Sequence, residues 1–98
     1  MIVIAKLKVK AGKEAEMDQS GRDMVAKVQD EEGTLAYALH RSQIDPTVFV
    51  FYEKYRDATA FQHHSTTPYL QEFFAKSGDW MDGSPEIQIF DEIASISR

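Results

Sequence analysis

The sequence predicts an α+β domain that spans residues 1–98 and contains one hydrophobic core. Segments rich in β-branched and aromatic residues alternate with segments whose apolar residues recur at helical spacing, which indicates strands and helices in turn. Two neighbouring strand segments are joined by a connection short enough for an antiparallel hairpin. A chain of 98 residues has no room for two cores, so we expect a single domain.

The chain begins with a predicted strand and a predicted helix. Residues 2–10 are mostly β-branched residues and lysine, which is typical of a strand. Residues 14–29 place Met17 and Met24 on one face of a helix whose other positions carry charged side chains. We expect the helix to end in a turn at Gly33, because glycine readily adopts the left-handed conformation that ends many helices.

Two strands come next, over residues 34–43 and 47–55. The turn between them contains Asp45-Pro46, a side-chain acceptor followed by proline, and its short length predicts an antiparallel hairpin. Successive side chains of a strand point to opposite faces of the sheet, and in both strands the apolar residues occupy both sets of positions. Both faces of the sheet must therefore be covered. Helices can cover only one face. We therefore expect a second copy of the chain to cover the other face, which gives a homodimer.

The remaining elements are a helical segment in two parts and a last strand. Asp57 is expected to cap a short helix that runs to about residue 65. Thr67-Pro68 predicts the start of another helix, with proline at the first helical position. Residues 86–96 form the last predicted strand. The order β-α-β-β-α-β is that of the ferredoxin-like arrangement, an antiparallel sheet with its helices on one face.

Composition excludes several classes of function. The net charge is -5, with 16 acidic and 11 basic residues, which argues against a nucleic-acid partner. The chain has no cysteine, so disulfides, thiolate nucleophiles and cysteine-ligated metals are excluded. We expect no signal peptide, no membrane-spanning segment and a cytoplasmic location.

Two of the three histidines are adjacent on the expected short helix. His64 follows Phe61 by three residues, so these side chains share a face, and His63 is rotated by about 100° toward solvent. His64 is therefore either a catalytic base or a structural histidine that bonds a backbone carbonyl. We expect no metal site, because the side chains of adjacent helical residues diverge.

The hairpin strands carry two further candidates, His40 and Glu53. Small alanines share the face of His40, and Glu53 shares a face with Phe51 on the neighbouring strand, which would leave room for a cavity. A carboxylate among aromatic rings has a perturbed pKa or pairs with a cation; a structural salt bridge is the alternative interpretation. Tyr69, at a helix start, and Trp80, in a loop, are the aromatic residues best placed to line a pocket.

Three motifs together resemble the antibiotic biosynthesis monooxygenase family, which includes small quinol monooxygenases. They are E-G-x-L-x-Y at residues 32–37, Y-E-x-Y at residues 52–55 and H-x-x-T-P at residues 64–68. The resemblance covers nearly the whole chain. It implies a ferredoxin-like protomer in a dimeric α+β barrel. It also implies oxidation of a quinol or polyketide-like phenol by O2 with no metal, flavin or other cofactor.

The resemblance also implies roles for particular residues. The helix histidine of the family falls on His64 and its strand glutamate on Glu53, so we expect these two to be catalytic, with His40 in support. Substrate-binding residues are expected at Tyr37, Phe51, Tyr69 and Trp80. Other relatives isomerise a phosphorylated carbonyl compound and carry the same H-x-x-T-P region. Isomerisation and a non-catalytic ligand-binding dimer therefore remain alternatives to oxygenation.

Overall fold

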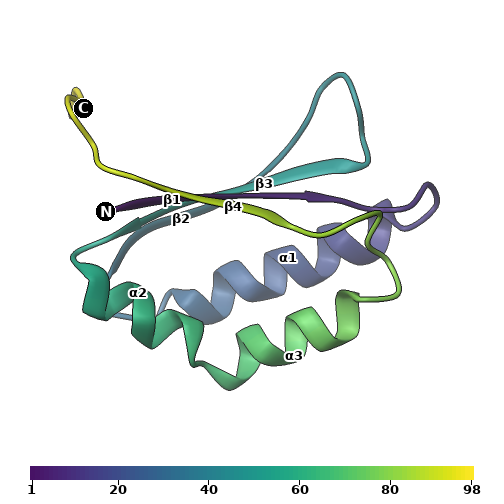
Figure 1. Cartoon of the computed structure of the whole chain (residues 1–98), viewed down its shortest axis with the longest axis horizontal. Helices are drawn as coiled ribbons and strands as arrows, with labels where there is room; N and C mark the ends of the chain where they lie inside the picture. Colours follow the sequence, from purple (N-terminus) through teal and green to yellow (C-terminus); the bar gives the residue numbers. More distant parts are fainter.

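The elements of the chain follow the predicted order, and the computed structural model describes all of residues 1–98. The strands form one antiparallel sheet in the order β2-β3-β1-β4, and the helices lie together on one of its faces (Figure 1). This confirms the ferredoxin-like arrangement with its second helical segment broken in two. The elements are β1 (Ile2–Lys8), α1 (Glu14–Val28), β2 (Thr34–Arg41), β3 (Val48–Tyr55), α2 (Ala58–Ser65), α3 (Pro68–Ser77) and β4 (Glu86–Phe90). No helix is both long and apolar enough to cross a membrane.

The core lies between the sheet and α1 and α3. Strands β1 and β3 turn every second side chain toward the helices, as the pleat of a strand requires, and these side chains are buried. The helical face of α1 that carries Met17 and Met24 packs against them. Burial of each large apolar side chain contributes about 1.5–3 kcal/mol. The buried core residues include Leu7, Val9, Phe49, Phe51 and Phe73.

The helix starts at α2 and α3 are those that the sequence predicts. The Asp57 side chain accepts a hydrogen bond from the backbone N–H of Ala60 at 2.9 Å, which caps α2. Pro68 occupies the first turn of α3. Thr67 has a second role, because its Oγ1 donates to the carbonyl of His64 at 2.8 Å and so satisfies a backbone group freed at the end of α2.

Gly33 does not adopt the left-handed conformation expected of it. Positive φ angles occur only at Gly12 and Gly83. Gly33 is instead a point of close approach, because a Cβ atom built there would lie 2.5 Å from the Cβ of Ala60. Absence of a side chain at Gly33 lets the start of β2 pack directly against α2.

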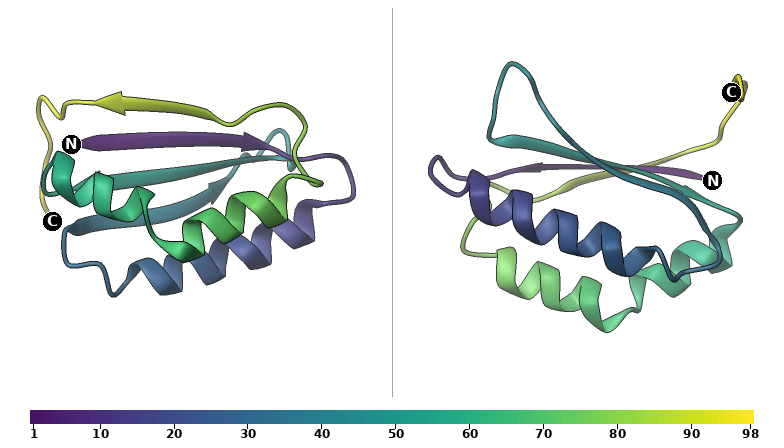
Figure 2. Two further views of the ribbon diagram at one scale, coloured as in Figure 1. Left: turned by 60° about the horizontal axis from the view of Figure 1, so that its bottom comes forward. Right: turned by 180° about the vertical axis from the view of Figure 1, so that it is seen from behind.

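The last strand is shorter than predicted, because β4 ends at Phe90 and residues 91–98 form no regular structure. This tail and the turn between β2 and β3 both extend on the side of the sheet that carries no helix, which we call the open face (Figure 1; Figure 2, right). Glu92 in the tail forms an ion pair with Lys54 of β3 at 3.3 Å. Apolar side chains on the open face include Ile4, Ala36, Ala38, Val50, Tyr52 and Phe90.

Candidate active site

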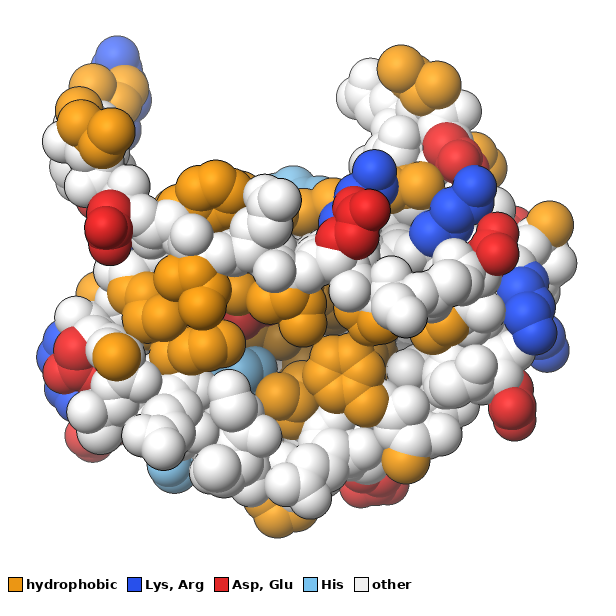
Figure 3. All heavy atoms as spheres, viewed as in Figure 1, with side chains coloured by type: hydrophobic (Ala, Val, Ile, Leu, Met, Phe, Trp, Pro, Cys, Tyr) orange, Lys and Arg blue, Asp and Glu red, His pale blue; other side chains and the backbone are white.

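A cavity of about 270 Å³ lies between the sheet and helices α2 and α3. Strand β4 runs beyond the edge of the helix layer (Figure 2, left), and the cavity is lined on that side by Pro85 and Ile87. Figure 3 shows a hollow rimmed by hydrophobic side chains, with histidine and acidic atoms visible inside it. Eleven of the sixteen lining residues are hydrophobic and none is lysine or arginine, so the cavity favours a neutral, apolar ligand.

His64 brings the only ring nitrogens into this cavity. It lies in the last turn of α2, is 2% exposed and lines the cavity together with Phe61 of the same helical face. His63 is exposed, as predicted. The Nδ1 atom of His64 lies 3.0 and 3.2 Å from the two carboxylate oxygens of Glu31. The Nε2 atom has no hydrogen-bond partner in the protein and is not sealed from solvent, so it is available to a ligand.

Glu31, which no sequence motif marks, anchors the histidine. It lies in the connection between α1 and β2 and is 7% exposed. Its carboxylate accepts hydrogen bonds from the hydroxyl groups of Tyr69 and of Thr34, the latter at 3.3 Å. Burial and the bond to Glu31 raise the pKa of Tyr69 to about 12, so this hydroxyl keeps its proton and acts as a donor. A buried carboxylate with these donors is fully satisfied.

Glu53 lies on β3 and shares a face with Phe51, as expected, and this face is the one that the helices cover. Its side chain lines the cavity and accepts a hydrogen bond from the Tyr55 hydroxyl at 2.5 Å. Burial raises the pKa of Glu53, while the Tyr55 hydrogen bond and the nearby His64 oppose that rise. The net increase extends the pH range over which Glu53 carries a proton.

Tyr37 also lines the cavity and lies opposite Glu53 on β2. Its ring centroid is 5.2 Å from that of His64 and 5.4 Å from that of Phe51. Burial, with the charges of Glu53 and Glu31, raises the pKa of Tyr37 above its usual range. The hydroxyl therefore stays protonated and, since it is paired with no other side chain, can donate to a ligand.

The structure does not bring His40 into the site. His40 pairs with Val50 on the open face and is exposed, whereas Tyr37 and Glu53 pair on the helix-covered face. The expectation that the face of His40 flanks Glu53 was wrong, because successive side chains of a strand point to opposite faces and the register gives Glu53 a different partner.

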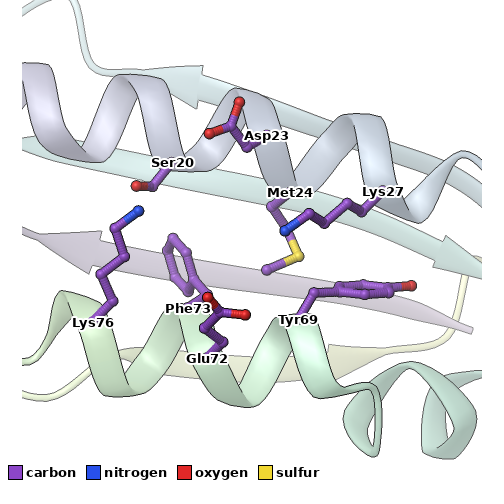
Figure 4. A pocket seen from close by; sticks show the side chains of 8 residues that line it. All are labelled: Ser20, Asp23, Met24, Lys27, Tyr69, Glu72, Phe73 and Lys76. Atoms are coloured by element: carbon purple, nitrogen blue, oxygen red, sulfur yellow. The ribbon is translucent and has the colours of Figure 1, made fainter.

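Two of the expected pocket aromatics also lie elsewhere. Tyr69 lies between α1 and α3 beside a pocket of about 50 Å³, room for a water molecule or two (Figure 4). It reaches the site only through Glu31. Trp80 follows α3, accepts a backbone hydrogen bond from Lys10 at 2.7 Å and packs against the core away from the cavity. Tyr37 and Phe51 do line the cavity.

Comparison with known proteins identifies relatives along most of the chain. The family model described as "Antibiotic biosynthesis monooxygenase" matches residues 1–76. "Putative monooxygenase YcnE" of Bacillus subtilis is 31% identical over 88 residues, which cover 89% of this chain and 93% of that protein. "Uncharacterized protein sll1783" of Synechocystis is 29% identical over 90 residues, which cover 92% of this chain and 61% of that protein.

Solved structures give the same result. A Caulobacter crescentus CB15 protein with the same family name has a TM-score of 0.89 and 36% identity, and the match covers 95% of this chain and 89% of that one. PA3566 of Pseudomonas aeruginosa has a TM-score of 0.88 and 25% identity, with 95% and 93% covered. Sequence and structure comparisons therefore identify relatives of the same family.

Proposed function

The chain belongs to the antibiotic biosynthesis monooxygenase family, and from this premise we propose that it oxidises a quinol or another electron-rich phenol with O2, using no metal or flavin. A quinol and O2 give a hydroxyquinone and water. One oxygen atom enters the ring, the other leaves as water, and the substrate supplies all the electrons. The protein supplies a base, an apolar pocket and hydrogen-bond donors, because a deprotonated phenol can itself pass an electron to O2.

His64 is the proposed base. The observation that carries the proposal is its free Nε2 atom in a cavity that is otherwise mostly apolar. A phenol hydroxyl in contact with this atom would transfer its proton to the ring, and a positioned base of this kind contributes about 10²–10⁴-fold in rate. Glu53 and Tyr37 are the proposed donors to the substrate anion, since the raised pKa of each favours the form that carries a proton.

The size and charge of the cavity support a neutral substrate with one or two rings. Its volume of about 270 Å³ is slightly below the range typical of pockets for drug-sized ligands, about 300–1,000 Å³. A phosphorylated substrate needs cations around its phosphate group, and no lysine or arginine lines this cavity. Phenol oxidation is therefore favoured over isomerisation of a phosphorylated carbonyl compound.

We also propose that a second copy of the chain covers the open face. Apolar side chains gather there without helices to cover them, and the tail and the β2–β3 turn both extend on that side (Figure 1). Sedimentation of the wild-type protein at micromolar concentration should give a dimer, and Val50→Lys, which places a charge near the middle of this face, should give a monomer. A monomeric wild-type protein would refute the proposed pairing.

The test of the proposed reaction is O2 consumption with a panel of reduced quinones, after subtraction of uncatalysed oxidation. His64→Ala should lower the catalysed rate by about 10²–10⁴-fold. His63→Ala is the matched control, because His63 is the neighbouring residue of the same helix but is exposed outside the cavity, and it should leave the rate unchanged.

Three results would change the conclusion. O2 consumption that is no faster with the protein present would refute phenol oxidation. Turnover of a phosphorylated carbonyl compound would establish isomerisation in its place. Tight binding of quinols without turnover would leave a ligand-binding dimer as the function.

A further inference from the structure

We propose that Glu31 is a positioning residue that fixes His64 in the tautomer with its proton on Nδ1, so that Nε2 is the ring atom that exchanges protons in the cavity. The catalytic meaning of this assignment rests on the function proposed above, whereas the tautomer itself is a property of the ligand-free protein. Nothing in the sequence motifs singles out Glu31, which is the middle residue of three consecutive acidic residues.

The hydrogen-bond geometry determines which partner donates. Both carboxylate oxygens of Glu31 lie within 3.2 Å of the Nδ1 atom of His64. An ionised carboxylate can only accept hydrogen bonds, and it already accepts from the hydroxyl groups of Tyr69 and Thr34. The Nδ1 atom must then carry a hydrogen to form its own bond. The neutral ring is left with a lone pair on Nε2.

Burial makes this preference strong. The side chains of His64 and Glu31 are only 3% and 5% exposed, so water competes little for the hydrogen bond between them. A histidine without such a partner populates both neutral tautomers, whereas a hydrogen bond from Nδ1 to a carboxylate selects one. Glu31 is itself held by Tyr69 of α3 and Thr34 of β2, so the orientation of the ring is determined from two separate elements.

The arrangement has a direct consequence for proton transfer. When a substrate hydroxyl group gives its proton to Nε2, the ring becomes an imidazolium whose Nδ1–H still points at the Glu31 carboxylate. The negative charge stabilises the new positive charge, and the carboxylate does not need to take up the proton. Glu31 thus acts on the reaction only through His64 and touches no substrate, since it does not line the cavity.

The tautomer can be measured directly, without substrate. We would label the histidines of the full chain with 15N and record long-range 1H–15N spectra while the pH is raised until the His64 signals no longer move. Nδ1 should then show the shift of a protonated nitrogen and Nε2 that of a bare nitrogen. A neutral His64 protonated mainly on Nε2 would overturn the proposal.

Glu31→Gln tests the role in the reaction. Glutamine offers one acceptor oxygen to three donors, so the Nδ1–H tautomer loses its advantage and Nε2–H should appear. We expect kcat to fall by about 10–100-fold, as for loss of other residues that orient a functional histidine, with KM changed less than about twofold. Glu32→Gln is the matched control, because it removes the same charge one residue away on an exposed side chain.

The outcomes separate the two proposals. If His64 carries its proton on Nδ1 but the protein oxidises no quinol, the positioning role of Glu31 is supported and the proposed oxidation is refuted. Quinol oxidation that is equally fast in wild type and Glu31→Gln refutes the positioning role and leaves the oxidation standing. The wild-type spectrum decides the tautomer even if Glu31→Gln does not fold.

Discussion

Replacing Tyr55 by phenylalanine removes one hydroxyl group and keeps the ring that fills the core. Tyr55 is 1% exposed, and its ring lies 5.2 Å from that of Phe61 and 5.8 Å from that of His64. Packing is therefore retained, and the change isolates the 2.5 Å hydrogen bond to Glu53. A hydrogen bond to a charged group contributes about 1.5–3 kcal/mol and one between neutral groups about 0.5–1.5 kcal/mol. We therefore expect Tyr55→Phe to lower the free energy of unfolding by about 1.5–3 kcal/mol when Glu53 is ionised and by about 0.5–1.5 kcal/mol when Glu53 is protonated.

The sign of the pH dependence follows from the pKa of Glu53. Burial raises this pKa above the value of 4.5 for an unperturbed glutamate, so the folded state favours the protonated acid and loses stability as the pH rises through the raised value. The Tyr55 hydrogen bond opposes the rise. Its removal raises the pKa of Glu53 further, so Tyr55→Phe should lose more stability than wild type over the same increase in pH.

Urea denaturation at fixed protein concentration measures both effects. The stability difference between wild type and Tyr55→Phe should be about 0.5–1.5 kcal/mol near pH 4, where Glu53 is protonated, and should increase toward about 1.5–3 kcal/mol as the pH rises through the raised pKa of Glu53. Tyr52→Phe is the control, because Tyr52 lies on the opposite face of β3 and its hydroxyl forms no hydrogen bond within the chain. A stability difference that stays constant from pH 4 to the alkaline limit of the folded protein would refute this account of Glu53.

Two further substitutions test the contacts that position the site. Gly33→Ala brings a Cβ atom to 2.5 Å from that of Ala60, and we expect the strain to lower the free energy of unfolding by about 1–3 kcal/mol; an unchanged melting temperature would contradict this close approach. Asp57→Ala removes the cap of α2 and should cost about 0.5–2 kcal/mol in urea denaturation. Asp57→Asn should retain most of that stability, and an equal loss in both variants would contradict the capping role.

Local signals in the sequence predict most of this fold. Proline at position 68 and the acceptor at Asp57 locate the two helix starts, because each acts on backbone groups within one turn. The spacing of Phe61 and His64 predicts that both side chains share one face of the helix, and both line the cavity. Alternation along β3 likewise puts Glu53 on a face with Phe51.

Features that depend on pairing between distant segments were not predictable. Strand β2 is apolar at both parities, so its sequence does not determine which face meets the helices, and His40 was placed beside Glu53 for that reason. Glu31 is one of three consecutive acidic residues, and only the way the chain leaves α1 determines which one is buried. Its partners Thr34 and Tyr69 come from different elements, so no local pattern marks the group.

The break between α2 and α3 also affects how tightly a ligand can bind. Thr67 holds the backbone carbonyl of His64 through both its N–H, at 3.2 Å, and its hydroxyl, at 2.8 Å, while Glu31 holds the imidazole. A side chain that must be immobilised on association costs about 0.5–1.5 kcal/mol in lost rotational entropy. His64 has already lost that freedom on folding. The entropy cost of ordering its side chain therefore lowers the stability of the protein and does not lower the affinity for the ligand.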